Sequence, residues 1–150
     1  MLLNILKINP VLVSAVLAWL IAQALKVLLD FLINRSWNWA LLFSAGGMPS
    51  SHSAMVSAAA LASGLHAGFS SPVFGVATVL AMIVIYDATG IRRESGRQAV
   101  LINTMFEEIS KGKIMQQKRL REVLGHTPGE AVMGTLLGLA LAGLVWVLLL

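Results

Sequence analysis

The chain has 150 residues, of which 57% are hydrophobic and only 12% are charged, and its mean hydropathy is +0.82. A soluble domain of this size would not be so apolar, so the composition indicates an integral membrane protein. The absence of cysteine excludes disulfides and thiolate metal sites. The formal net charge is +4, but the basic residues cluster beside apolar segments, which favours anionic or phosphorylated lipid over nucleic acid as the partner.

Four apolar segments are predicted to form membrane helices, at residues 11–33, 54–68, 72–86 and 128–150. The second segment is rich in Ala, Ser and Gly, and small residues let membrane helices approach closely, so we expect it at the centre of the bundle. The expected fold is therefore all-α. It is a single domain, residues 1–150, built as a membrane helix bundle with about four transmembrane helices and additional interfacial amphipathic helices.

The first segment carries three polar residues within the membrane, Gln23, Lys26 and Asp30. Lys26 and Asp30 are four residues apart on one helix face, so they can pair with each other. Alternatively they turn toward the bundle interior, since ionisable residues in a membrane are functional candidates. Trp37 and Trp39 follow the segment and are typical of interfacial anchors.

The polar loop between the third and fourth segments holds eight of the eleven Lys and Arg residues. The positive-inside rule places this loop in the cytoplasm, so both termini are expected on the opposite side. Within the loop, residues 98–110 and 115–124 each place apolar side chains on one helix face, which predicts two amphipathic helices along the membrane surface. This topology brings the polar residues at the ends of the spans to one cytoplasmic mouth: Arg35, residues 50–52, residues 87–93 and His126.

Residues 46–53 read Gly-Gly-Met-Pro-Ser-Ser-His-Ser and lead into the second apolar segment. Glycine lets backbone amides approach a ligand closely, and proline suits the first turn of a helix. The segment therefore predicts a helix N-terminus that binds an anion, with His52 as a proton donor beside it. The alternative is an ordinary serine-capped helix start with an incidental histidine.

A second motif, His-Thr-Pro-Gly-Glu, begins at His126. Thr127 and Glu130 have the spacing of a capping box. Glu130 can also accept a hydrogen bond from Nδ1 of His126, which leaves Nε2 as a nucleophile. The two interpretations of Glu130 do not exclude each other. The third histidine, His66, lies beside glycines at the far end of the second segment and is expected to be a surface residue.

Two histidines, one of them with a carboxylate, and several cations at helix ends supply what phosphoryl transfer through a phosphohistidine requires. Cations and amides hold the phosphate oxygens, one imidazole attacks in line, and the other protonates the departing alkoxide. Since few carboxylates converge, Lys and Arg rather than Mg²⁺ are expected to neutralise the phosphate, with no metal and no cofactor.

These motifs resemble those of the type-2 phosphatidic acid phosphatase superfamily, which includes the vanadium haloperoxidases. Residues 49–52 resemble its P-S-G-H motif, residues 126–130 its H-x-x-x-D motif, and Lys26 with Arg35 its lysine–arginine motif. From about Lys26 to the C-terminus, the chain is similar to the short, divergent branch of membrane proteins related to acid phosphatases and vanadium haloperoxidases. The resemblance implies a nucleophile, its carboxylate partner and a general acid at His126, Glu130 and His52, and phosphate ligands at Ser50, Ser51, Lys26 and Arg35.

The chain departs from the superfamily pattern at several points. Eight residues instead of six separate Lys26 from Arg35, and Ser51, Glu130 and Leu120 stand where glycine, aspartate and arginine are usual. Nine helical steps separate Lys26 from Arg35 by about 14 Å, so both cannot contact one phosphate unless the helix bends. Of the two we expect Arg35 at the mouth and Lys26 in a structural role. Four spans rather than six also make a homodimer plausible.

The arginine missing at position 120 has two sets of candidate replacements. We expect Asp87 to hold Arg92 or Arg93 toward the phosphate, because a bidentate guanidinium suits this task. The alternative is that Arg119 or Arg121 takes the role and Asp87 is structural.

The function expected is that of a lipid-phosphate phosphatase, a multi-pass protein of the cell membrane with its active site facing the cytoplasm. Its substrate would be phosphatidylglycerophosphate, phosphatidate or a polyprenyl phosphate. The alternative is a non-catalytic membrane protein that binds anionic lipid or scaffolds a partner through the basic loop. A small-anion transporter is less well supported, because four short spans without an internal repeat make a thin transport path, and a serine hydrolase lacks the nucleophile-elbow pattern.

Overall fold

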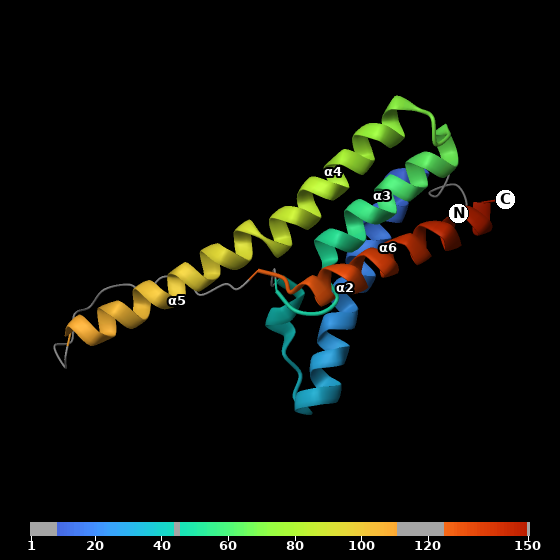
Figure 1. Cartoon of the computed structure of the whole chain (residues 1–150). Coiled ribbons are helices and arrows are strands. Elements are labelled where there is room, and N and C mark those ends of the chain that lie inside the picture. The colour runs from blue at the N-terminus through green and yellow to red at the C-terminus, as the bar shows by residue number, and fades with distance from the viewer. Residues whose placement is uncertain (1–8, 44–45, 111–124, 150) are drawn as a thin grey trace.

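The computed structural model describes residues 9–43, 46–110 and 125–149, without the side chains of residues 92 and 107–110. The described residues form helices and connecting loops (Figure 1). In chain order the elements are α2 (Pro10–Asn34), the 3-10 helix η1 (Trp39–Phe43), α3 (Ser51–Ala67), α4 (Pro72–Thr89), α5 (Ile91–Ser110) and α6 (Pro128–Leu149).

Short polar side chains set the starts of three helices by accepting backbone N–H groups that have no partner within the helix. Asn9 Oδ1 accepts from the third residue of α2 at 3.0 Å. Ser50 and Ser71 cap α3 and α4 in the same way, each at 3.3 Å. At the other end of α2, Arg35 adopts a left-handed conformation with φ 55°, which stops the helix.

Helix α3 lies at the centre of the bundle, in contact with α2, α4 and α6 (Figure 1). Its alanines at positions 54, 58 and 62 form a buried cluster with Ala18 and Ala22 of α2 and Ala142 of α6. The prediction that the segment rich in small residues is central is confirmed. The physical reason is that alanine and glycine let helix backbones approach to a distance that larger side chains would prevent.

Helices α3 and α6 approach each other closely. A Cβ atom added at Gly134 would overlap the backbone carbonyl oxygen of Ser50, and one added at Gly138 would overlap that of Ala54. The two glycines are four residues apart, so they lie on one face of α6 and form a Gly-x-x-x-Gly contact with the first turns of α3. This contact brings the N-termini of α3 and α6 together.

Three stretches of the described residues are long and apolar enough to cross a membrane: Pro10–Asn34, Pro72–Phe106 and Pro128–Leu149. The all-α membrane helix bundle is therefore confirmed. The predicted second span is helix α3, which has 17 residues and is thus about 26 Å long, somewhat less than the hydrocarbon core of a typical bilayer. The number of four spans accordingly stays a prediction.

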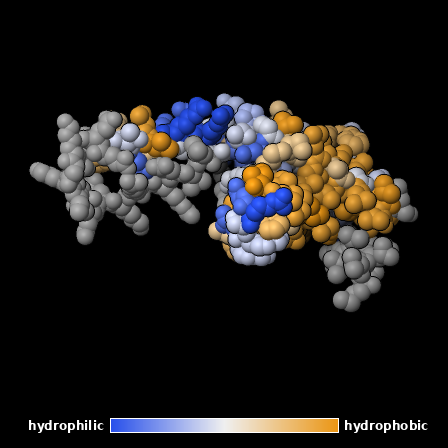
Figure 2. Space-filling view, turned by 90° about the horizontal axis from the view of Figure 1, so that it is seen from below, coloured by the Kyte–Doolittle hydropathy of each residue, from blue (hydrophilic) through white to orange (hydrophobic). Residues whose placement is uncertain are grey.

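The predicted amphipathic helix 98–110 is part of a longer helix, α5, that begins at Ile91 directly after Gly90. Its apolar side chains Leu101 and Met105 are exposed, and its position along the membrane surface stays a prediction. The second predicted amphipathic helix, 115–124, lies outside the described residues. Figure 2 shows hydrophilic side chains gathered at the end of α2 and on the part of α5 next to the bundle, whereas the bundle itself is largely apolar.

The Gly-x-x-x-Gly contact predicts opposite effects of one substitution at two glycines of the same helix. Gly138→Ala forces α6 away from the carbonyl of Ala54 and should destabilise the protein by about 1–3 kcal/mol, as overpacking does in other cores. Gly143→Ala is the matched control, because the space beside Gly143 is open and alanine favours a helix by up to about 1 kcal/mol. Thermal unfolding of both variants in detergent tests the contact, and equal midpoints would contradict it.

Candidate functional site

Three helix ends meet at one end of the bundle and are joined by backbone hydrogen bonds. The N–H of Ser50, before α3, donates to the carbonyl of Glu130 in α6 at 3.0 Å. The N–H of His126, before α6, donates to the carbonyl of Ala88 at the end of α4, also at 3.0 Å. The polar motifs of these three helices therefore converge, as their common position in the predicted topology required.

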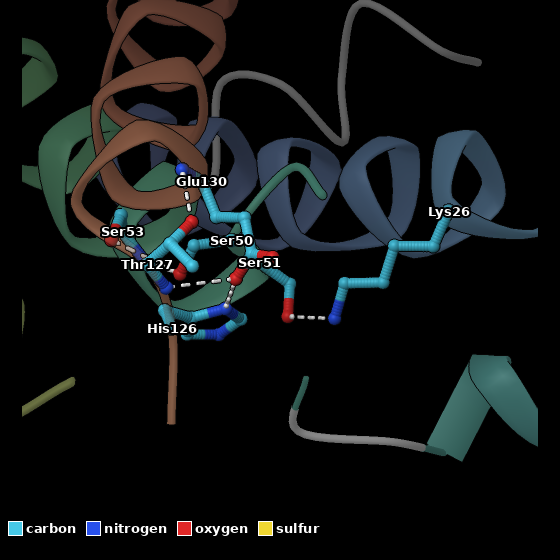
Figure 3. Close-up of polar contacts among 7 residues, drawn as sticks. All are labelled: Lys26, Ser50, Ser51, Ser53, His126, Thr127 and Glu130. Carbon is cyan, nitrogen blue, oxygen red and sulfur yellow. Dashed lines mark hydrogen bonds and ion pairs between the residues drawn. The ribbon is translucent and has the colours of Figure 1, made fainter. Parts of the chain in front are cut away.

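The carboxylate of Glu130 has two partners in the motif that precedes it (Figure 3). Its Oε2 lies 3.1 Å from Nδ1 of His126 and accepts the backbone N–H of Thr127 at 3.0 Å. The N–H of Glu130 in turn donates to Oγ1 of Thr127 at 3.3 Å, which completes the capping box. Both interpretations of Glu130 are thus present together. When neutral His126 donates from Nδ1, its lone pair is on Nε2.

The two histidines of the motifs are neighbours. The ring centroids of His52 and His126 are 6.5 Å apart, with an angle of 57° between the ring planes. His126 is 3% exposed, whereas His52 is half-buried. His66 lies at the other end of α3, where its ring packs edge-on against Trp146, so it takes no part in this cluster.

Lys26 reaches the site from the middle of α2 (Figure 3). Its Nζ donates to Oγ of Ser51 at 3.4 Å, at the long end of the hydrogen-bond range, and Lys26 and Ser51 are both buried. The alternative partner considered for Lys26, Asp30, instead accepts a hydrogen bond from Asn34 at 2.7 Å.

Arg35 lies at the exposed end of α2, which continues beyond the N-termini of α3 and α6 (Figure 1). Which of the two residues binds phosphate stays a prediction, but the structure places Lys26, and not Arg35, beside Ser51. The reason is where α3 begins along the axis of α2: the first turn of α3 lies beside Lys26, which precedes Arg35 by nine residues. The sequence spacing argued against a joint contact of Lys26 and Arg35 with one phosphate but could not show which residue faces Ser51.

Ser50 is bonded within the protein through both its hydroxyl and its backbone N–H. Its Oγ accepts the N–H of Ser53 at 3.3 Å and the hydroxyl of Ser53 at 3.0 Å, while its own N–H is bonded to Glu130. Ser50 therefore joins α3 to α6 and caps α3. Ser53 was missed as part of this network, although its position three residues after a serine at a helix start was a usable signal.

The arginine candidates are only partly placed by the structure. Asp87 is half-buried on the last turn of α4, next to Ala88, whose carbonyl binds the backbone of His126. Arg93 is half-buried near the start of α5, where the ion pair that the structure gives joins Glu94 to Arg97 at 3.5 Å. The side chain of Arg92 and the whole of Arg119 and Arg121 lie outside the described residues. The choice of arginine therefore stays a prediction.

The described part of the chain holds no group of three His, Asp or Glu side chains close enough to bind a metal ion together. The acidic residue nearest the histidines, Glu130, is engaged by His126 and Thr127. What the site offers is a pair of imidazoles, one of them bonded to a carboxylate, beside a buried ammonium group and the N-terminus of α3.

Comparisons with known proteins identify the family of the chain. The divergent PAP2 family matches residues 7–141, so the similarity begins earlier than the expected start near Lys26. The chain is 38% identical over 144 residues to the uncharacterized membrane protein YuiD of Bacillus subtilis (strain 168), covering 89% of this chain and 91% of that protein. No solved structure matches the chain. The resemblance drawn from the motifs is confirmed, and the chain belongs to the divergent PAP2 family of membrane proteins, which is related to phosphatases.

Proposed function

We propose that the protein is a membrane phosphatase that removes the terminal phosphate of a phosphorylated lipid through a phosphohistidine at His126. The observation that carries this proposal is the contact of Nδ1 of His126 with the carboxylate of Glu130, with the ring of His52 6.5 Å away. A buried histidine held in this way has its lone pair on the opposite ring nitrogen, which is what a nucleophile needs.

In the first step, Nε2 of His126 attacks the phosphorus atom of the monoester. The P–N bond forms as the bond from phosphorus to the lipid oxygen breaks, and the imidazolium of His52 gives its proton to the departing alkoxide. The positive charge that develops on the ring of His126 is stabilised by Glu130, which lies 3.1 Å from Nδ1. The lipid alcohol leaves, and phosphate remains on His126.

In the second step, neutral His52 takes a proton from a water molecule as the water oxygen attacks the phosphohistidine. The P–N bond breaks, inorganic phosphate leaves, and both histidines return to their starting states. Lys26, Ser51 and the N-terminus of α3 stabilise the negative charge on the phosphate oxygens during both steps. An arginine from the loop completes this set in the proposal, with Arg92 or Arg93 preferred over Arg119 and Arg121.

The substrate class follows from the position of the site at the end of a membrane bundle. Phosphatidylglycerophosphate, phosphatidate and polyprenyl phosphates all present a terminal phosphate close to a bilayer surface. The cytoplasmic orientation is supported by the eight of eleven basic residues in the loop between α4 and α6. The same loop would attract anionic lipid in the non-catalytic alternative, which lacks any requirement for the paired histidines.

The direct test is phosphate release by purified protein from a panel of these lipids. His126→Ala should lower turnover by about a thousandfold or more while the protein remains folded in detergent, because the nucleophile is lost. His66→Ala is the matched control and should be close to neutral, since His66 lies at the opposite end of α3. Equal turnover by the two variants, or no phosphate release from any lipid, would reject the proposal.

The two roles of Glu130 predict effects that can be separated. Glu130→Gln keeps an acceptor for the cap but loses the charge that stabilises the imidazolium, so kcat should fall about 10- to 100-fold, or about 1.4–2.8 kcal/mol. Thr127→Ala removes the acceptor for the N–H of Glu130 and should cost about 1 kcal/mol of stability with little change in kcat. Steady-state kinetics and thermal unfolding of both variants separate the effect on kcat from the effect on stability. If Glu130→Gln lost stability but kept its kcat, the carboxylate would be purely structural.

Charge neutralisation by protein cations predicts the response to inhibitors. Activity should survive EDTA and be inhibited by vanadate, which can form a five-coordinate species on His126 in place of the transferred phosphoryl group. Phosphate release measured with each reagent provides the test. A strict need for Mg²⁺ that disappears in Asp87→Asn would instead indicate a metal-assisted reaction.

A further inference from the structure

Helix α3 lies at the centre of the bundle, yet one row of its residues is not fully covered. Within residues 51–60, every residue is buried except His52, Met55 and Ala59, which are half-buried. Their spacings of three and four residues place them on one face of the helix. The row begins at the histidine proposed as general acid, and Ala59 lies about 10 Å from it along the helix axis.

This row lies between the surfaces through which α3 contacts α2 and α4. On one side of it, Ser51 and Ala58 face α2. On the other side, Val56 and Ala60 pack against Ala81 of α4. Helices α2 and α4 both pack on α3 (Figure 1), but among the described residues they make little contact with each other. The row is therefore left uncovered between the two helices.

The surroundings of the row are the hydrocarbon of the bilayer. Helices α2 and α4 belong to stretches that are long and apolar enough to cross a membrane, Pro10–Asn34 and Pro72–Phe106, so a row between them faces lipid. Toward the far end of α3 the row is closed, because the next residues on this side, Ala62 and Ser63, are each 1% exposed. It is thus open over about two helical turns and ends at the histidines.

The two ends of the row differ in chemistry. Ala59 is small and apolar, and the unbranched thioether of Met55 adapts to the shape of what it contacts. At the other end the ring of His52 is 6.5 Å from that of His126, and the ammonium of Lys26 reaches the start of α3. A complementary ligand carries a phosphate at one end and a hydrocarbon chain at the other. A lipid phosphate monoester has this form, whereas phosphatidylcholine carries a further group on its phosphate.

We propose that one hydrocarbon chain of a lipid phosphate monoester lies along His52, Met55 and Ala59, between α2 and α4, with its phosphate at the histidines. The lipid reaches the site laterally, without leaving its leaflet. Met55 and Ala59 are then specificity-determining residues, since a molecule without a chain gains nothing from the row. The place of the phosphate rests on the proposed function, whereas the contact of the chain with the row can be measured without turnover.

Photoaffinity labelling tests this contact. Phosphatidate and phosphatidylcholine, each with a diazirine in one acyl chain, are irradiated with the protein in phosphatidylcholine vesicles, and the adducts are located by mass spectrometry. The His126→Ala protein is used so that the phosphate is not removed during irradiation. The phosphatidate probe should label the segment of Met55 and Ala59 at least tenfold more than the phosphatidylcholine probe, and unlabelled phosphatidate should compete. Equal labelling by the two probes would mean ordinary contact with the bilayer and would overturn the proposal.

Filling the row provides a matched pair of variants. Ala59→Phe should abolish the preference for the phosphatidate probe, and Ala59→Leu serves if the phenylalanine variant does not fold. Val79→Phe is the control, because Val79 is exposed on α4 only two residues from Ala81, which packs on α3 at the depth of the row. The preference should persist in the control. Its persistence in both Ala59 variants, or its loss in Val79→Phe, would contradict the assignment of the chain to this row.

A second copy of the protein is the competing occupant of the row. Because the chain contains no cysteine, Ala59→Cys introduces a single thiol. Oxidation in vesicles should leave this variant monomeric, since a lipid chain rather than another protein molecule covers the row. A disulfide-linked dimer formed in high yield by Ala59→Cys, but not by Val79→Cys, would assign the row to a subunit interface and overturn the proposal.

Activity separates this inference from the proposed function. Ala59→Leu should raise KM for phosphatidate about tenfold with little change in kcat, because the chain is bound equally in the ground state and the transition state. A fall in kcat at unchanged KM would mean that Ala59 acts on the histidines, against the proposal. If no lipid phosphate is hydrolysed at all, the proposed function fails, while selective labelling of the row still supports a binding site for the chain.

Discussion

The close contact of α3 with α6 is the constraint on which the rest of the site depends. Gly134 and Gly138 allow the first turns of α3 to lie directly against α6, at a distance where even a methyl group would overlap a backbone carbonyl. At this distance the N–H of Ser50 reaches the carbonyl of Glu130. The two N-termini are therefore locked together, and each has a histidine in its motif. A wider separation of the helices would part His52 from His126.

Several polar side chains are buried inside the bundle, and most of them are small. Ser50, Ser51 and Ser53 are fully buried at the start of α3, and Lys26 is nearly so. In a membrane a buried polar group must find its partner within the protein, because hydrocarbon offers none. Ser50 accepts hydrogen bonds from the hydroxyl and the backbone N–H of Ser53, and Ser51 accepts one from Lys26. The same bonds that stabilise the helix start thus place an ammonium group and a helix N-terminus beside the imidazoles.

Glu130 belongs both to the cap of α6 and to the pair with His126. One carboxylate oxygen accepts both the N–H of Thr127 and the imidazole of His126, so the cap that begins α6 also orients the ring. A glutamate in the third helical position reaches back to the helix start, which is the geometry of a capping box.

The sequence by itself determined the membrane class, the all-α fold, the central place of the helix rich in small residues, the pairing of His126 with Glu130, and the family. Each of these depends on composition or on contacts within a few residues, so local patterns suffice. Only the tertiary structure decided that Lys26 rather than Arg35 meets Ser51, that Ser50 is bonded to Glu130, and that Gln23 is bonded to Leu42. These contacts join residues 19 to 80 positions apart, and they depend on where one helix begins along another. The length of a helix can be predicted from its sequence. Its position along the axes of the neighbouring helices, however, is set by the packing of glycines and alanines across the bundle.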